Sequence, residues 1–183
     1  MLGINSAISK YVVGSLNLRS TMMTDKKTVL KQLNEHVPLS KFSEEHQNDK
    51  EIVLEAVRVT EENLRYASEN LKRDKDVVLE ALKGYHTALK YADKTILSDR
   101  EFMYEACKIE PWSLQYASDE IKSDREIVLI CVEQSWQCLE FADKSLRGDR
   151  NIVTHAVKIN GMALDFASDE LQKDPELKKI AEG

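Results

Sequence analysis

Residues 49–73 read DKEIVLEAVRVTEENLRYASENLKR, and residues 74–98 repeat the pattern as DKDVVLEALKGYHTALKYADKTILS. The period is 25 residues. A constant period of this size is typical of stacked units, each of which buries its apolar face against the next. We number the places of a unit from the aspartate that begins it, and these aspartates are Asp49, Asp74, Asp99, Asp124, Asp149 and Asp174.

The first half of each unit predicts an α-helix. In the first full unit, Ile52, Val53, Ala56 and Val57 fall on one face at helical spacing. An aspartate just before such a face is a helix N-cap, because its carboxylate accepts hydrogen bonds from the free amides of the first turn. We therefore predict a helix over about 50–59 and assign the six periodic aspartates as structural N-caps.

The second half of each unit predicts a shorter helix that begins near place 13. Place 12 is a good N-cap type in three units, with Thr60, Ser135 and Asn160, and Pro111 stands at place 13 of another unit. Place 20 is Ser or Asp throughout, which predicts a second cap followed by a short 3₁₀ or helical turn. A single helix that continues to place 23 is the alternative.

The two ends of the array differ from its interior. The segment 25–48 is a degenerate first repeat that lacks one residue, and 174–183 begins a last cap helix with Lys178 where other units carry Val or Met. A polar end is expected of a repeat array. Residues 1–24 hold two cations and no acid, which predicts either a helix that caps the stack or a targeting segment. Between these ends, 49–173 hold five repeats of 25 residues.

Composition bounds the class of protein. The chain of 183 residues is 42% apolar and 32% charged, which favours a globular protein over a disordered one. Its net charge of −6 disfavours nucleic-acid binding, which requires a basic surface. No apolar run reaches the roughly 20 residues of a membrane span. The three cysteines, Cys107, Cys131 and Cys138, fall at core places and suit reduced thiols in the cytoplasm.

No set of residues in the sequence predicts chemistry. The four histidines, His36, His46, His86 and His155, share no metal-site spacing, and all six glycines are isolated. Catalysis needs unlike groups at one point, whereas the periodic aspartates spread like groups along an axis. We therefore predict no catalytic residue, no cofactor and no metal. A row of acids that binds cations or a basic partner is the alternative interpretation of the aspartates.

The corner between the two predicted helices, places 11–14, is where the units differ most. Because stacking places these corners side by side, we predict a ridge of variable, largely aromatic side chains along one edge. Tryptophan and tyrosine are favoured anchors of protein interfaces, so the ridge is the candidate partner-binding site. The alternative is that these side chains fold back and fill gaps between units. The ridge residues are Tyr85, His86, Trp112, Trp136 and Met162.

A second candidate surface lies at places 7 and 10 of the first helix. Most units carry an acid at place 7 and a cation at place 10, three residues apart, which stabilises a helix modestly. A solvated charged face is the favoured interpretation. Ile130 interrupts the row and is expected to be an exposed apolar residue.

The segments ENLRYASENLKRDKDVVLEAL, WSLQYASDEIKSDREIVLICV and MALDFASDELQKDP resemble a tandem-repeat family known as domain of unknown function 4116. The resemblance covers about 49–174 and, more loosely, 25–48. It implies an α-helical repeat, and it transfers no catalytic or binding residue. The family is associated with intracellular bacteria and some protists, which implies delivery to a host cytoplasm if the chain comes from such a bacterium.

The sequence as a whole predicts an all-α solenoid of 25-residue helical repeats, with a helix pair or a helix plus a short helical turn in each unit. The expected function is non-catalytic: a scaffold that binds a protein or peptide and does not bind nucleic acid. A bacterial effector, or a regulatory subunit that acts on a host or partner enzyme, is the second hypothesis. An enzyme with an unrecognised site is the third, and the oligomeric state is open.

Overall fold

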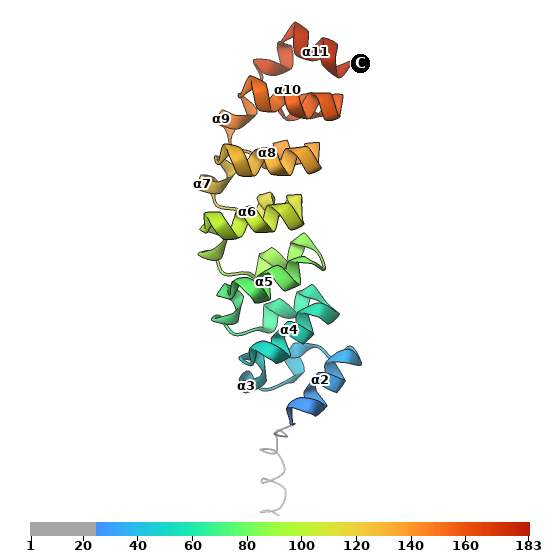
Figure 1. The fold of residues 1–183 in the computed structure, drawn as a ribbon, viewed down its shortest axis with the longest axis vertical. Coiled ribbons are helices and arrows are strands. Elements are labelled where there is room, and N and C mark those ends of the chain that lie inside the picture. The colour runs from blue at the N-terminus through green and yellow to red at the C-terminus, as the bar shows by residue number, and fades with distance from the viewer. Residues whose placement is uncertain (1–24) are drawn as a thin grey trace, which may run out of the picture.

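The 25-residue period of the sequence becomes a period of three short helical segments in space. A computed structural model describes residues 25–183, in which these segments form an elongated stack (Figure 1). The cap helix or targeting segment expected at 1–24 lies outside the described residues. The predicted class, an all-α repeat solenoid, is confirmed for the part of the chain that the structure describes.

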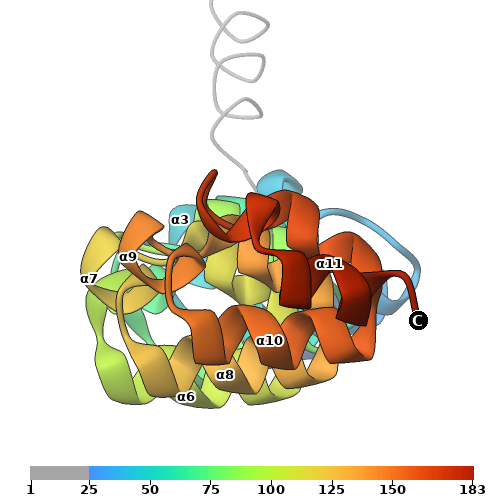
Figure 2. The ribbon, with the colours of Figure 1, turned by 90° about the horizontal axis from the view of Figure 1, so that it is seen from above.

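The first segment of each unit is the α-helix that the apolar spacing predicts. The helix expected over 50–59 is present at those residues, and its apolar face of Ile52, Val53, Ala56 and Val57 is buried. Seen along the stack, successive first helices lie one behind another with a small sideways offset (Figure 2). These helices are α2 (Lys26–Asn34), α4 (Lys50–Val59), α5 (Lys75–Leu82), α6 (Arg100–Ile109), α8 (Arg125–Gln134), α10 (Arg150–Ile159) and α11 (Pro175–Ala181).

The second segment is a six-residue 3₁₀ helix in each full unit, and the third is a single turn. The 3₁₀ helices are η2 (Glu61–Tyr66), η4 (His86–Tyr91), η6 (Pro111–Tyr116), η7 (Trp136–Phe141) and η8 (Gly161–Phe166), with a shorter η1 (Leu39–Lys41) in the first repeat. The turn segments are α3 (Glu44–Gln47), η3 (Leu71–Arg73), η5 (Ile96–Ser98), α7 (Asp119–Lys122), α9 (Lys144–Arg147) and η9 (Leu171–Lys173). The alternative of one continuous second helix is therefore wrong.

A backbone hydrogen bond between units explains why the second helix stops. The N–H of Ser68, at place 20, donates to the carbonyl of Gln47 in the preceding unit at 2.9 Å, and the residue before it is extended. A helix that continued through place 20 would use this N–H internally. Four further bonds repeat the contact at 2.9–3.1 Å: Asp93 to Lys72, Ser118 to Leu97, Asp143 to Lys122 and Ser168 to Arg147.

The core runs without interruption along the stack, because the same places are buried in every unit. The small residue at place 8 lies where successive first helices contact each other, and all five side chains are fully buried: Ala56, Ala81, Ala106, Cys131 and Ala156. Small side chains let helices approach closely. Place 15 is also buried, and its Asn63 accepts a hydrogen bond from the Leu39 amide and donates one to the Ala56 carbonyl, both at 2.9 Å.

The N-caps predicted at place 12 are only partly present. Asn160 accepts from the Met162 amide at 2.9 Å, but the side chains of Thr60 and Ser135 cap nothing. Glu110, whose residue type did not suggest a cap, accepts from the amide two residues on. The longer side chains at this extended place reach that amide, whereas the short hydroxyls do not.

Both described ends close the core with polar outer faces. Asp25 caps α2 through the Thr28 amide, although its unit is one residue short. At the other end Leu177 is fully buried while Lys178 is exposed. Gly161 begins η8 directly beneath the end of α11, and a Cβ atom there would lie 2.2 Å from the Ala181 carbonyl oxygen.

Candidate functional site

The corners of the five full units lie side by side, because the 3₁₀ helices that begin at them contact one another along the stack. The predicted ridge is divided between exposed and half-buried side chains. Tyr85 and Met162 are 54% and 63% exposed, whereas His86, Trp112 and Trp136 are half-buried. The two interpretations offered by the sequence therefore hold for different residues of the same edge.

The tryptophans pack across the boundaries between units. Trp112 meets Phe141 of the next unit edge-on, with ring centroids 5.5 Å apart. Trp136 stacks on Phe166 of the next unit at 5.9 Å. In each pair, a corner side chain packs against the aromatic residue at place 18 of the following unit. Both tryptophans thus fill space between units and keep part of their surface at the edge.

Tyr85, His86 and Trp112 form a cluster of rings at the boundary between η4 and η6. The ring centroids of Tyr85 and His86 are 4.3 Å apart, and His86 stacks on Trp112 at 5.9 Å. These three side chains, with Glu110 and Gln115, line a shallow hollow of about 470 Å³. We call it the Tyr85–Trp112 hollow.

Two isoleucines that the sequence analysis did not single out belong to the same edge. Ile109 and Ile159 stand at place 11, at the ends of α6 and α10, and are 44% and 47% exposed. With Tyr85 and Met162 they make four of the six exposed large apolar side chains among residues 25–183. The signal was in the sequence, since place 11 is apolar in these units and Gly or Gln in two others.

The opposite edge holds the periodic aspartates at the starts of the first helices. Their carboxylates accept hydrogen bonds from main-chain amides of the first turn in all six helices, as N-caps do. For Asp74 the donors are the amides of Asp76 and Val77, at 3.1 and 3.2 Å. Two amides of the first turn also donate to Asp49, Asp124, Asp149 and Asp174, and the Phe102 amide donates to Asp99.

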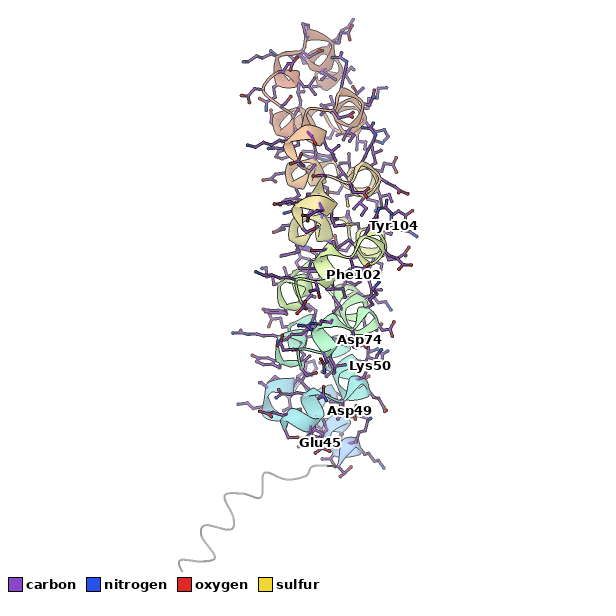
Figure 3. All side chains as sticks on the ribbon, turned by 90° about the vertical axis from the view of Figure 1, so that its left-hand side faces the viewer. Glu45, Asp49, Lys50, Asp74, Phe102 and Tyr104 are labelled. Atoms are coloured by element: carbon purple, nitrogen blue, oxygen red, sulfur yellow. The ribbon has the colours of Figure 1, made fainter. Side chains whose placement is uncertain are left out.

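Each of these aspartates is also paired with a cation of the preceding unit, which the sequence analysis missed. Lys50 lies beside Asp74 (Figure 3), and its Nζ is 2.9 Å from that carboxylate. The same Nζ is 2.7 Å from the carboxylate of Asp76. Place 2 is Lys or Arg in every unit that precedes one of these aspartates, but the repeat pattern alone does not show that place 2 faces the next unit. The remaining pairs of this ion-pair ladder are Lys26–Asp49, Lys75–Asp99, Arg100–Asp124, Arg125–Asp149 and Arg150–Asp174.

The ion-pair ladder favours the ionised form of the aspartates, and each carboxylate already binds a Lys or Arg side chain. The pKa of Asp174 falls to about 2, because Arg150 donates to its carboxylate and the Leu177 amide adds a second hydrogen bond. The pKa of Asp99 is also lowered, by hydrogen bonds from the Phe102 amide and then from Lys75. The row of aspartates is therefore a row of caps and ion pairs, and it does not present free acids to a cation.

The charged face of the first helices carries a few further pairs. Arg58 donates to Glu80 of the next unit at 2.9 Å, and Lys83 lies 2.7 Å from the same carboxylate. The expectation that Ile130 is exposed was wrong. It is half-buried because neighbouring first helices flank α8 on both sides and cover part of its outer face.

The thiols are not available for chemistry. None of the three cysteines forms a disulfide, and all three side chains are fully buried. Burial raises the pKa of Cys138 to about 12. The pKa of Cys131 is also raised, by its hydrogen bond with Cys107 and by burial. Thiols in this state are poor nucleophiles, since the thiolate is the reactive form.

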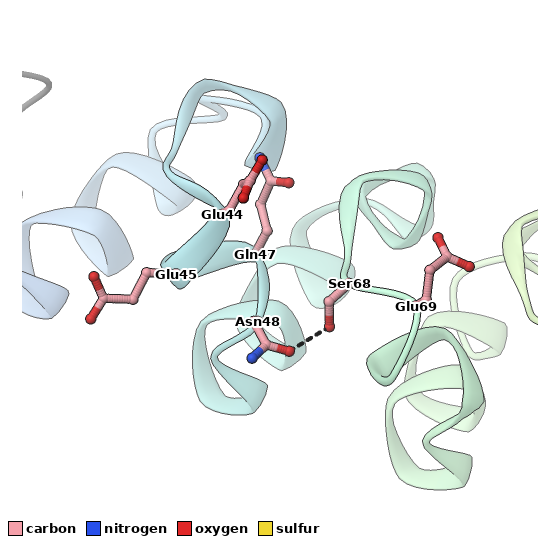
Figure 4. A pocket seen from close by; sticks show the side chains of 6 residues that line it. All are labelled: Glu44, Glu45, Gln47, Asn48, Ser68 and Glu69. Carbon is pink, nitrogen blue, oxygen red and sulfur yellow. Dashed lines mark hydrogen bonds between the residues drawn. The ribbon is translucent and has the colours of Figure 1, made fainter.

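Two further hollows of the described residues lie along the turn edge. One of about 520 Å³ is lined by Glu44, Glu45, Gln47, Asn48, Ser68 and Glu69 (Figure 4). Its acidic side chains point away from one another, and Ser68 donates to Asn48 at 2.7 Å. Across residues 25–183 no group of His, Cys, Asp and Glu is arranged to hold a metal ion. No helix within these residues has the length and apolarity to cross a membrane.

The comparisons with known proteins agree with the repeat. Residues 49–97, 99–147 and 149–181 each match the family described as a domain of unknown function, DUF4116. The chain belongs to this family. The first two DUF4116 matches each span two of the 25-residue units, so the family's repeat is a pair of the structural units seen here. No curated protein and no solved structure matches the chain.

Proposed function

We propose that this DUF4116 chain is a protein-binding scaffold whose contact edge is the variable corner of the stack. The observation that carries the proposal is the gathering of Tyr85, Ile109, Ile159 and Met162 on one edge, which makes up most of the exposed large apolar surface of residues 25–183. Single exposed apolar residues are ordinary, but the gathering of four of the six on one edge supports a contact surface there.

The rest of the stack supports this edge by fixing its geometry. The five backbone bonds between units and the six rungs of the ion-pair ladder repeat at the same places in every unit. Because units are held in one register, side chains at places 11–14 stand at regular intervals along the edge. A partner segment that runs along the stack would meet them in sequence, as partners of other solenoids do.

A binding role is favoured over catalysis by the placement of the reactive groups. The three thiols are fully buried, and the ladder carboxylates are each bound to a cation and to main-chain amides. An active site needs unlike groups that converge on one reacting atom. We also propose a cytoplasmic location, which the unpaired thiols of the core favour.

Site-specific photocrosslinking tests the proposal. A photoreactive phenylalanine analogue replaces Tyr85 or Met162 on the corner edge, and matched control variants carry it at Thr95 or Glu120, which are exposed on the turn edge. We expect crosslinked partners from the corner positions and none from the controls. Identical crosslinks from both edges, or none from either, would contradict the proposal.

A binding measurement with the recovered partner then separates contact from chance proximity. The double variant Tyr85→Ser/Met162→Ser should lose at least about tenfold in affinity, because exposed aromatic and sulfur side chains are typical anchors. Both residues are more than half exposed, so the variant should unfold at nearly the same denaturant concentration as the native chain. Unchanged affinity of this variant would rule out the corner as the contact edge.

A further inference from the structure

The Tyr85–Trp112 hollow combines aromatic rings with one carboxylate. Tyr85, His86 and Trp112 supply three adjacent rings, and Glu110 supplies the only acid of the lining. Gln115 adds an amide at the side of η6. Aromatic faces attract cations through the negative potential above the ring, and a carboxylate adds a direct charge.

Glu110 differs from the aspartates of the ladder because no cation among residues 25–183 pairs with it. Each ladder aspartate lies within ion-pair distance of a Lys or Arg, whereas no Lys, Arg or His of residues 25–183 lies within that distance of Glu110. Its one hydrogen bond is from the Trp112 amide, at 3.3 Å. The carboxylate therefore has acceptor capacity left, at the rim of an aromatic hollow and in a chain of net charge −6.

We infer that the Tyr85–Trp112 hollow binds an arginine side chain of a partner protein. This inference rests on the proposed function and specifies the chemistry of its partner. The guanidinium group is planar, stacks on aromatic rings and donates in a fork that matches a carboxylate. Lysine offers a compact, strongly hydrated charge and fits such a surface less well. A purely apolar side chain would leave the Glu110 carboxylate without a partner.

The experiment uses tripeptides as probes and tryptophan fluorescence as readout. The chain has two tryptophans, so the Trp136→Phe variant reports on Trp112 alone. We titrate it with blocked Gly-Arg-Gly, with the same peptide carrying citrulline, which is the neutral isostere, and with Gly-Lys-Gly. We expect a change in Trp112 emission with the arginine peptide, a Kd in the millimolar range, and at least about fivefold weaker binding of the citrulline peptide. The lysine peptide should fall between them.

Glu110→Gln tests the role of the carboxylate. Glutamine retains an oxygen that accepts from the Trp112 amide, so the local cap is kept while the charge is lost. We expect arginine binding to weaken about fivefold and citrulline binding to stay the same. The matched control is Asp119→Asn, which removes one exposed acid from the turn edge and should change neither affinity. Raising the salt concentration should weaken arginine binding and leave citrulline binding unchanged.

A second measurement covers the case in which Trp136→Phe disturbs the packing on Phe166. The indole N–H signals of the native chain, followed by NMR during the same titrations, give the affinity without any substitution. Equal affinities for arginine and citrulline, or unchanged arginine affinity in Glu110→Gln, would overturn the inference. If the inference fails in this way while the corner positions still give crosslinked partners, the proposed scaffold function is retained without the arginine site. Arginine selectivity without corner crosslinks would show an arginine-binding hollow but no partner protein at this edge, which would overturn both the partner named in the inference and the proposed scaffold role.

Discussion

Replacing Asp124 with alanine removes two distinct interactions from the interior of the stack. Its carboxylate accepts hydrogen bonds from the amides of Glu126 and Ile127, at 3.0 and 3.1 Å, and Arg100 of the preceding unit donates to it at 2.7 Å. Loss of an N-cap lowers the free energy of unfolding by about 0.5–2 kcal/mol. An ion pair with a half-exposed partner contributes about 0–1 kcal/mol. Together these contributions predict that Asp124→Ala lowers the free energy of unfolding by roughly 0.5–3 kcal/mol.

Asp124→Asn separates the cap from the charge. Asparagine caps a helix about as well as aspartate does, but it forms no ion pair. We therefore expect this variant to lose no more than about 1 kcal/mol. The difference between the Ala and Asn variants then measures the cap. Arg100→Met, alone and combined with Asp124→Asn, measures the ion pair by a double-mutant cycle.

The assay is chemical denaturation followed by far-UV circular dichroism, at low salt and at high salt. High salt should shrink the coupling between Arg100 and Asp124 and leave the cap effect unchanged, because salt screens exposed charges. Equal losses in the Ala and Asn variants would refute the capping argument. A stability of Asp124→Ala equal to that of the native chain would refute both contributions. A smaller denaturant dependence in the variants would show that the array no longer unfolds as one unit.

Gly161→Ala should lower the free energy of unfolding by about 1–3 kcal/mol in the same denaturation assay, because the new Cβ atom meets the backbone of Ala181. The control Gly148→Ala should be nearly neutral, because the atom nearest to its Cβ lies 3.4 Å away. The pKa of Asp174 lies at about 2, below its ordinary 3.8. The ionised carboxylate therefore stabilises the fold above about pH 4, and this contribution is lost as the pH falls towards 2. The melting temperature of Asp174→Asn should accordingly fall less steeply in acid than that of the native chain. Cys138, fully buried and with its pKa raised to about 12, should resist alkylation by iodoacetamide in the folded chain and react after unfolding, as followed by mass spectrometry.

The regular part of the fold was predictable from the sequence because each rule repeats. The apolar spacing from Ile52 to Val57 gave the first helix, and the Ser68 cap gave the third segment. A single unit would have supported these predictions weakly. Five units with the same residues at the same places remove accidental matches, so even the break before Ser68 was visible.

Contacts between units were harder to predict because the period alone does not say which places face each other. The cation at place 2 follows its own aspartate directly, and neighbouring residues in a helix do not face each other. Only the stacking geometry shows that Lys50 points to Asp74 of the next unit. The exposure of Trp112 was unpredictable for the same reason, since its partner Phe141 belongs to another unit.

The two edges of the stack obey different constraints, and this difference explains where variation is tolerated. At the turn edge one residue often serves two units: Asp74 caps its own helix and binds Lys50 of the preceding one. A substitution there disturbs both units, which keeps the edge uniform. At the corner edge Tyr85 and Met162 are mostly exposed, so their identity can change with little effect on stability. Places 11–14, the proposed contact edge, can therefore vary between units while the stack beneath keeps its register.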